Sequence, residues 1–146
     1  RVVYVRSDKK VWITSSAEPG TPVQAGASAV KIASANNGLY RVDGGGRIYY
    51  KEHGATQWNE IDGSRTAADV GFHNGKLYIL RNDGTIDALV DPPELTNLEF
   101  IKVAGYTAGE SVTYFEALKG GLLVVSSKGR QLCGWPCSSS NSVVDI

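Results

Sequence analysis

Short runs of apolar residues alternate with polar residues along the chain, and glycine, asparagine and aspartate separate the runs. The clearest example is the segment 75–90, in which two apolar runs flank Asn82-Asp83-Gly84. A period of two residues is typical of β-strands, and Asp-Gly between two strands favours a tight turn because glycine accepts a positive φ. The pattern therefore predicts an all-β domain built from hairpins.

The same hairpin recurs at intervals of about 40 residues. Tyr78 is followed by a glycine after six residues and by an isoleucine after eight, and Tyr40 shows the same two offsets. Leu123 keeps the glycine offset, and Tyr4 places Trp12 at the isoleucine position. The sequence thus predicts four hairpins, one in each of four repeats.

Further strands are predicted on either side of the hairpins. An apolar run precedes the second, third and fourth hairpins and contains Ile32, Val70 and Phe115, respectively. An aromatic-x-x-aliphatic-x-Gly segment follows the second and third hairpins, at 58–63 and 100–105. Four strands in about 40 residues are typical of a β-propeller blade, in which we expect the apolar run to be the inner strand.

These repeats predict one small β-propeller of about four blades, with units of about 1–28, 29–66, 67–110 and 111–146. A β-trefoil and a sandwich are the alternatives, although a trefoil needs three repeats. The first hairpin has no apolar run before it, so one blade lacks its inner strand or receives it from elsewhere. An uncovered strand edge invites pairing, and self-association through this unpaired blade edge is therefore a hypothesis.

The composition narrows the classes of partner. The 15 Lys and Arg residues balance the 15 Asp and Glu residues, so the basic surface that nucleic acid requires is not expected. No apolar run approaches the ~18 residues of a membrane span, so no membrane partner is expected either. The chain contains no methionine and begins with Arg1, which indicates a processed start or an excised piece.

Both cysteines lie in the segment Cys133-Gly-Trp-Pro-Cys137. This spacing favours a small structural disulfide in an oxidising compartment, with two free thiols as the alternative. A metal site is not indicated, because His53 and His73 lie far from the pair in the sequence. The disulfide and the missing methionine together predict an extracellular or secreted protein.

The segment 47–84 contains an Ile-Tyr hairpin arm, a Gly-x-x-x-Trp-x-x-Ile-x-Gly segment, a Val-Gly strand and a Gly-x-Leu-Tyr arm that ends in Asp-Gly. In this series of motifs the segment resembles the tectonin repeat. The third repeat has Phe100 in place of the tryptophan, and the first and fourth repeats keep only the hairpins. Tectonin-like proteins are β-propellers and several are lectins, so the resemblance implies carbohydrate binding without a cofactor. Their usual number of blades exceeds the four predicted here.

A lectin site needs an aromatic face for the sugar ring and polar groups for the sugar hydroxyls. The aromatic residues of the repeats and of the cysteine segment, with their polar neighbours, are the candidates, and packing between blades is their alternative role. Tyr49 and Tyr50 are adjacent on a strand and point to opposite faces, so one of them is expected to be exposed. The candidate ligand-binding residues are Trp12, Arg47, Tyr49, Tyr50, Trp58, Asn59 and Trp135.

An enzyme needs an acid and base pair, or an activated nucleophile, brought together in space. His53 follows Glu52, but neighbours on a strand point apart, and His73 lies in a turn-like His-Asn-Gly segment. No nucleophile elbow, metalloprotease motif or phosphate loop is present. We therefore predict a non-catalytic binding module, first a lectin for glycans, with a protein-interaction propeller as the alternative and a hydrolase or other enzyme below both. In the alternative, the loops 91–94 and 106–111 would decorate one rim.

Overall fold

The computed structural model describes a chain of antiparallel β-strands arranged in four successive sheets. Sheet 1 has three strands, and sheets 2, 3 and 4 have four strands each. In each sheet the strands pair in the order in which they occur along the chain. The structure describes residues 2–14, 23–62, 66–104, 112–118, 121–126, 130–133 and 144–145.

The strands are short, between two and seven residues in length. Sheet 1 contains β1 (Val2–Val5), β2 (Lys10–Thr14) and β3 (Val23–Ser28). Sheet 2 contains β4 (Lys31–Ser34), β5 (Gly38–Val42), β6 (Ile48–Glu52) and β7 (Asn59–Asp62). Sheet 3 contains β8 (Ala67–His73), β9 (Lys76–Arg81), β10 (Ile86–Val90) and β11 (Ile101–Ala104). Sheet 4 contains β12 (Val112–Leu118), β13 (Gly121–Ser126), β14 (Arg130–Cys133) and β15 (Val144–Asp145).

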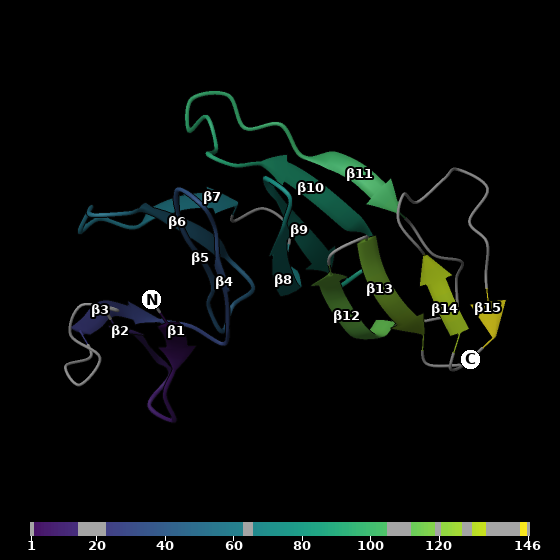
Figure 1. The fold of residues 1–146 in the computed structure, drawn as a ribbon, viewed down its shortest axis with the longest axis horizontal. Coiled ribbons are helices and arrows are strands. Elements are labelled where there is room, and N and C mark those ends of the chain that lie inside the picture. Colours follow the sequence, from purple (N-terminus) through teal and green to yellow (C-terminus); the bar gives the residue numbers. More distant parts are fainter. Residues whose placement is uncertain are drawn as a thin grey trace.

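The four sheets follow one another in an open arc, with sheet 1 at one end and sheet 4 at the other (Figure 1). Neighbouring sheets touch through their first strands, since β1 contacts β4, β4 contacts β8, and β8 contacts β12. Ile32, Val70 and Phe115 lie on β4, β8 and β12, so the prediction that they mark neighbouring inner strands is confirmed. Four separate sheets also confirm the four blades and exclude the three repeats of a trefoil.

The first strand of sheet 1 corresponds to the second strand of the other sheets. It forms a tight hairpin with β2, as β5 does with β6 and β9 with β10. Within the described residues, sheet 1 therefore has no counterpart of β4, β8 and β12. This agrees with the missing apolar run before the first hairpin.

The hairpin turns show that the predicted alignment of the first repeat is wrong by one residue. The residue with positive φ is Lys9 in the first turn, Gly46 in the second and Gly84 in the third. Lys9 therefore holds the place that the sequence pattern gave to Lys10. The repeat pattern locates each turn by its glycine. It therefore misplaced the first turn, in which a lysine adopts the positive φ that glycine usually provides.

The corrected alignment also changes the face on which Trp12 lies. Val11, rather than Trp12, is equivalent to Ile48 and Ile86, and all three side chains are 0% exposed. Ile48 points from sheet 2 toward the next sheet, so we place Val11 on the face of sheet 1 that looks toward sheet 2. Because neighbours on a strand point to opposite faces, Trp12 lies on the other face of sheet 1.

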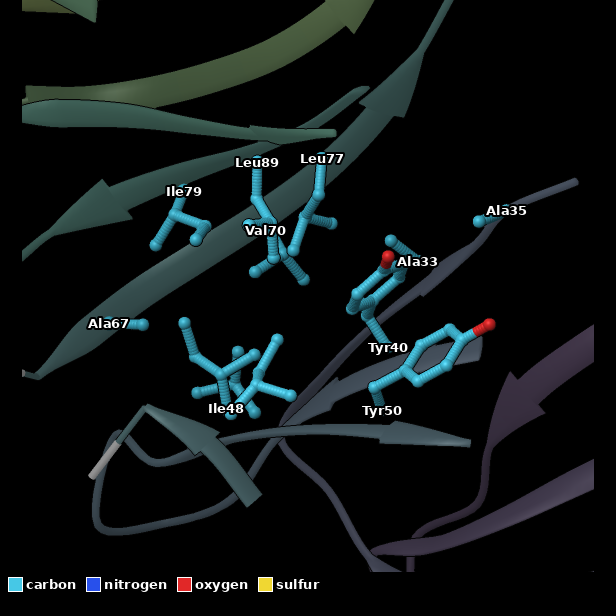
Figure 2. Packing of buried hydrophobic residues seen from close by; sticks show 12 residues of the cluster. Ala33, Ala35, Tyr40, Ile48, Tyr50, Ala67, Val70, Leu77, Ile79 and Leu89 are labelled. Atoms are coloured by element: carbon cyan, nitrogen blue, oxygen red, sulfur yellow. The ribbon is translucent and has the colours of Figure 1, made fainter. Parts of the chain in front are cut away.

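The main hydrophobic core lies between sheets 2 and 3 (Figure 2). Alternate residues of β5 and β6 point into it from one side, and alternate residues of β9 and β10 from the other. Leu98 and Phe100, in the connection to β11, pack against its margin. The core residues are Ala33, Ala35, Tyr40, Val42, Ile48, Tyr50, Ile61, Ala67, Val70, Leu77, Ile79 and Leu89.

Candidate functional site

An arginine that was not predicted from the sequence lies at the centre of the face of sheet 2 that looks toward sheet 1. Arg41 alternates on β5 with two core residues, so its side chain leaves the sheet on the opposite face. Its guanidinium carbon lies 3.9 Å from the ring centroid of Tyr49 and 4.9 Å from that of Trp58. Its Nη1 donates a hydrogen bond of 2.8 Å to the carbonyl oxygen of Ser28 in β3. We call Arg41, Tyr49 and Trp58 the Arg41 cluster.

Burial determines the electrostatics of the Arg41 cluster. Arg41 is only 9% exposed, and this burial lowers the pKa of its guanidinium, while the charges of Tyr49 and Asp43 act in the opposite direction. Its Nε finds no hydrogen-bond partner among the described residues. The aromatic rings therefore replace part of the hydration that this cation has lost.

Arg47 extends the Arg41 cluster to the surface. Its side chain is exposed, and a hydrogen bond with Tyr49, followed by the charges of Tyr49, Glu60 and Asp43, raises the pKa of its guanidinium. Three of the predicted site residues, Arg47, Tyr49 and Trp58, are thus gathered around one buried arginine.

Tyr50 and Asn59 lie on the other face of sheet 2. Tyr50 is 4% exposed, and its ring centroid lies 4.9 Å from that of Tyr40 in the core. Its hydroxyl donates a hydrogen bond of 3.3 Å to the Asn37 carbonyl oxygen, and burial raises the pKa of that hydroxyl. Asn59 pairs with Tyr50 in the ladder and therefore shares its face. The two adjacent tyrosines point to opposite faces as expected, but neither is fully exposed, because Tyr49 is half-buried and Tyr50 is buried.

Trp12 forms a second contact between an arginine and an aromatic ring, on sheet 1. The guanidinium carbon of Arg6 lies 3.7 Å from the Trp12 ring centroid. The indole Nε1 is buried and has no hydrogen-bond partner in the part of the chain that the structure describes. An arginine thus covers one face of Trp12, Tyr49 and Trp58, which leaves a sugar ring only the opposite faces for stacking.

Several predicted features fall outside the described residues. Trp135 and Cys137 are among them, as is the side chain of Cys133, whose backbone ends β14. The loop 106–111 lies outside them too. The disulfide and a role for Trp135 therefore stay predictions.

His53 and Asp69 each make a contact with a residue distant in the sequence. The Nε2 atom of His53 lies 3.2 Å from the Ala35 carbonyl oxygen. Asp69, four residues before His73, lies 3.8 Å from the Lys31 ammonium group, and burial raises the pKa of its carboxyl. No group of three or more His, Cys, Asp or Glu side chains within the described ranges is placed to hold a metal ion. Nor do these ranges contain a helix long and apolar enough to cross a membrane.

The connection between β10 and β11 is anchored to sheet 2. Asp91 accepts a hydrogen bond of 2.7 Å from the Tyr40 hydroxyl and one of 3.0 Å from the Asn37 side-chain amide. Burial, and next the contact with Asp91, raises the pKa of the Tyr40 hydroxyl far above its ordinary value. These contacts fix the start of the loop 91–100 against the neighbouring sheet.

Three apolar side chains are exposed in and beside this loop. Val90 is 57% exposed, Leu95 46% and Ile101 60%, and we call these three residues the rim patch. Ile101 pairs with Ala88, two residues before Val90, so Val90 and Ile101 point to the same face of sheet 3. The loop 91–94 was predicted from the sequence, but these three residues were not. The signal that could have marked them is an apolar residue at either end of a polar connection with two prolines.

Comparison with known proteins gives the fold a wider context. Neither a protein-family model nor a curated protein matches the chain. Among solved structures, human WBSCR16 aligns over 88% of this chain and 43% of its own, with a TM-score of 0.66 and 9% identity. YCF48 bound to D1 peptide aligns over 100% of this chain and 52% of its own, with a TM-score of 0.66 and 15% identity. Prp20p from Saccharomyces cerevisiae aligns over 88% and 40%, with a TM-score of 0.62 and 11% identity.

The chain is built of β-propeller blades. All three matched structures are β-propellers, and identities this low support the fold alone. The chain spans between 40% and 52% of the length of these propellers.

The propeller geometry places the anchored loop and its anchor at one rim. Connections after the first and third strands of a blade leave the sheet at the same end, because successive strands are antiparallel. Asn37 follows the first strand of the second blade, and Asp91 follows the third strand of the third blade. Their hydrogen bond therefore joins two neighbouring blades at the rim that carries loop 91–100.

Proposed function

We propose that this propeller is a non-catalytic scaffold that binds an extended segment of a partner protein at the rim patch. The observation that carries the proposal is the exposure of Val90, Leu95 and Ile101 beside a loop that the Asp91 contacts hold in place. Val90 and Ile101 share one face of sheet 3, and Leu95 lies in the loop between them. Exposed apolar side chains that form one patch mark sites of protein association.

The position of β11 supports an extended partner. This strand is the last in the order of sheet 3, so one of its edges pairs with no strand in the described structure. An extended peptide can add to such an edge through its backbone, while exposed side chains of the sheet select its apolar residues. Val90 and Ile101 lie on one face beside this edge.

The matched propellers favour protein binding as the class of function. YCF48 was solved with a bound D1 peptide, and Prp20p was characterised by its binding to Gsp1p and histones. The D1 peptide, Gsp1p and histones are partners of YCF48 and Prp20p, and they are not proposed as partners of this chain. What they support is a propeller that binds another polypeptide.

A peptide-display library, selected on the chain and followed by fluorescence anisotropy, tests the proposal. We expect Val90→Asp/Ile101→Asp to weaken binding of the selected peptides at least about tenfold, which corresponds to a loss of about 1.4 kcal/mol. The matched control is Val30→Asp, another valine that is 46% exposed, in the connection from sheet 1 to sheet 2. Peptides that bind the double variant as tightly as the unchanged chain would show that the rim patch is not the site.

Carbohydrate binding is the second candidate, supported by the tectonin-like repeat in 47–84. The arginines beside Trp12, Tyr49 and Trp58 limit stacking to one side of each ring. A glycan array separates the two candidates. Hits that share one sugar class and disappear in Trp12→Ala or Trp135→Ala, with the fold retained, would favour the lectin.

We also propose that the protein works in an extracellular, oxidising compartment, as a Cys133 to Cys137 disulfide would imply. Counting thiols with and without reductant tests this. The expected result is no reactive thiol before reduction and two afterwards, since the chain has two cysteines. Two reactive thiols before reduction would contradict it.

A further inference from the structure

Arg41 is a cation at a position where the next blade carries an aliphatic side chain. It directly follows the tyrosine that anchors its hairpin, as Ile79 does in the next blade, so the two residues are equivalent. Ile79 is 0% exposed in the core between sheets 2 and 3, whereas Arg41 is 9% exposed and reaches from sheet 2 to sheet 1. Burying a guanidinium costs free energy that burying an aliphatic side chain does not. A residue that breaks the local rule in this way is typical of a functional site.

The guanidinium of Arg41 has a donor that the described residues do not use. Its Nη1 atom donates a hydrogen bond to the Ser28 carbonyl oxygen, and the rings of Tyr49 and Trp58 lie against the guanidinium. Its Nε atom is buried and has no hydrogen-bond partner among the described residues. Buried polar groups in folded proteins are normally hydrogen-bonded. An unpaired donor on a buried cation therefore points to an acceptor that a ligand can supply.

The described carboxylates near the Arg41 cluster do not take this role. Asp43 accepts hydrogen bonds of 2.9 Å and 3.0 Å from the backbone N–H groups of Gly45 and Arg47 in its own turn. Glu60 is exposed, and its charge acts on the guanidinium of Arg47 at the surface. An acceptor for the Nε atom of Arg41 therefore has to come from outside the described residues.

The second buried arginine shows which acceptor such a guanidinium takes in this protein. Arg81 lies over the aromatic residue of its own repeat, with 5.2 Å between its guanidinium carbon and the ring centroid of Phe100. Its nitrogen atoms also lie 2.8 Å and 3.0 Å from carboxylate oxygens of Asp62 and Asp87. Carboxylate oxygens match the spacing of guanidinium N–H groups and form strong, charge-assisted hydrogen bonds with them. The chemical group that best fits the Nε donor of Arg41 is therefore a carboxylate.

The surroundings of the Arg41 guanidinium suit a sugar ring that bears this carboxylate. Tyr49 and Trp58 are half-buried, and the ring faces turned away from Arg41 are apolar surfaces of the kind on which sugars stack. Glu60 pairs with Tyr49 in the ladder, and Arg47 forms a hydrogen bond with Tyr49. Both charged side chains are exposed and offer polar groups to sugar hydroxyls.

We propose that the Arg41 cluster binds an acidic sugar, whose carboxylate accepts a hydrogen bond from Nε of Arg41 and whose ring lies against Tyr49 or Trp58. Because Nε is buried, one of these two half-buried aromatic rings turns aside to admit the ligand. The proposal rests on the carbohydrate candidate for its class of ligand and narrows that candidate to sugars that carry a carboxylate. It is independent of peptide binding at the rim patch, which lies on sheet 3 and its loop.

NMR titration of the isotope-labelled chain with glucuronate and with glucose tests the proposal, since glucose lacks the carboxylate. We expect glucuronate to shift the Nε–H resonance of Arg41, which Arg41→Met identifies by removing it. Glucuronate should also bind at least about tenfold more tightly than glucose, and Arg41→Met should abolish this preference. The matched control Lys76→Met also removes one positive charge, from an exposed side chain of sheet 3, and should keep the preference.

A second variant keeps the test decisive if Arg41→Met fails to fold. Arg41→Lys retains the positive charge but not the planar fork of N–H groups, so it should bind glucuronate more weakly than the unchanged chain does. Equal binding of glucuronate and glucose would overturn the acidic preference, as would glucuronate binding that leaves the Nε–H resonance unshifted. Tighter binding of N-acetylglutamate amide than of glucuronate would also overturn it, since the site would then select an acidic side chain of a protein.

The proposals can fail separately. No binding of either sugar would overturn the acidic-sugar site, while the glycan array decides on the carbohydrate candidate as a whole. Peptides selected for the rim patch should bind Arg41→Met as tightly as the unchanged chain. Loss of peptide binding in Arg41→Met would show that the two sites are not independent and would overturn the assignment of the Arg41 cluster to a sugar alone.

Discussion

Two successive junctions between blades use the same repeat but are built differently. Sheets 2 and 3 meet mainly through aliphatic side chains, among which Ile48, Leu77 and Ile79 are 0% exposed, together with the rings of Tyr40 and Tyr50 (Figure 2). Sheets 1 and 2 meet at the Arg41 cluster, where a cation and two aromatic rings stand in place of part of this apolar contact. Each junction contains one buried arginine, Arg41 in the first and Arg81 in the second, and the surroundings of these two side chains can be compared.

The two arginines differ in what surrounds their charge. Arg81, at the edge of the core, has Nη2 2.8 Å from an Asp62 carboxylate oxygen and Nε 3.0 Å from one of Asp87. Arg41 has two aromatic rings and a carbonyl oxygen, and no described carboxylate lies within ion-pair distance of it. The charge at the core is therefore part of a paired network, whereas the charge at the first junction is held by rings and one backbone group. Removing the arginine should consequently have very different effects at the two junctions.

The largest effect is expected for Arg81→Met. This change leaves Asp62 and Asp87 buried without their cation, and removing one partner of a buried ion pair costs about 4 kcal/mol. Urea unfolding followed by circular dichroism measures the loss. Adding Asp62→Asn and Asp87→Asn to the variant should recover most of the stability, because the two buried charges are then absent. A cost below about 1 kcal/mol for Arg81→Met alone would mean that the carboxylates are not held by the arginine.

Tyr40→Phe should have an intermediate effect at the rim of the core junction. It removes the 2.7 Å hydrogen bond from the Tyr40 hydroxyl to Asp91, and a hydrogen bond to a charged group contributes about 2 kcal/mol. Urea unfolding at neutral pH measures this loss. Val30→Phe, which alters an exposed side chain elsewhere, is the control and should leave the unfolding midpoint nearly unchanged.

The same variant tests the pKa of Tyr40, which burial raises above its ordinary value of 10.0. Below that value the hydroxyl is neutral in both the folded and the unfolded state, so its contribution to stability is complete. As pH rises above it, the unfolded chain ionises first, and stability falls. Tyr40→Phe should therefore lose less stability between neutral and alkaline pH than the unchanged chain. Tyr50 and Tyr78, whose pKa values burial also raises, contribute to the loss that remains. An equal alkaline loss in both proteins would contradict this assignment.

The inner strands could be predicted from the sequence because each is marked by a short apolar run. Ile32, Val70 and Phe115 lie in apolar runs that precede a hairpin at a constant offset, and this signal needs no knowledge of the rest of the fold. The alignment of the first repeat could not be predicted, because Lys9 adopts the positive φ that a glycine marks elsewhere. A positive φ at a residue other than glycine cannot be recognised from the sequence pattern.

The site could be predicted only in part, for a similar reason. The two-residue period of a strand predicts that Tyr49 and Tyr50 point to opposite faces. It does not predict which face looks toward sheet 3 and its core. Arg41 was missed because a charged residue in a strand reads as solvent-exposed. Its burial comes from Tyr49 on the next strand, from Trp58 beyond it and from sheet 1, none of which is adjacent in the sequence.

The smallest effect is expected for Arg41→Met, which makes the same change at the first junction. The loss of the ring contacts and of the Ser28 hydrogen bond is offset by removing a buried cation whose pKa is lowered by desolvation and whose Nε has no described partner. Methionine also packs well against aromatic rings. We therefore expect a cost below about 1 kcal/mol in urea unfolding. Arg41→Ala, which removes the packing along with the charge, should cost more. If Arg41→Met is as destabilising as Arg81→Met, the rings of Tyr49 and Trp58 stabilise a buried guanidinium as much as two carboxylates do. The two junctions would then not differ in how they stabilise a buried charge.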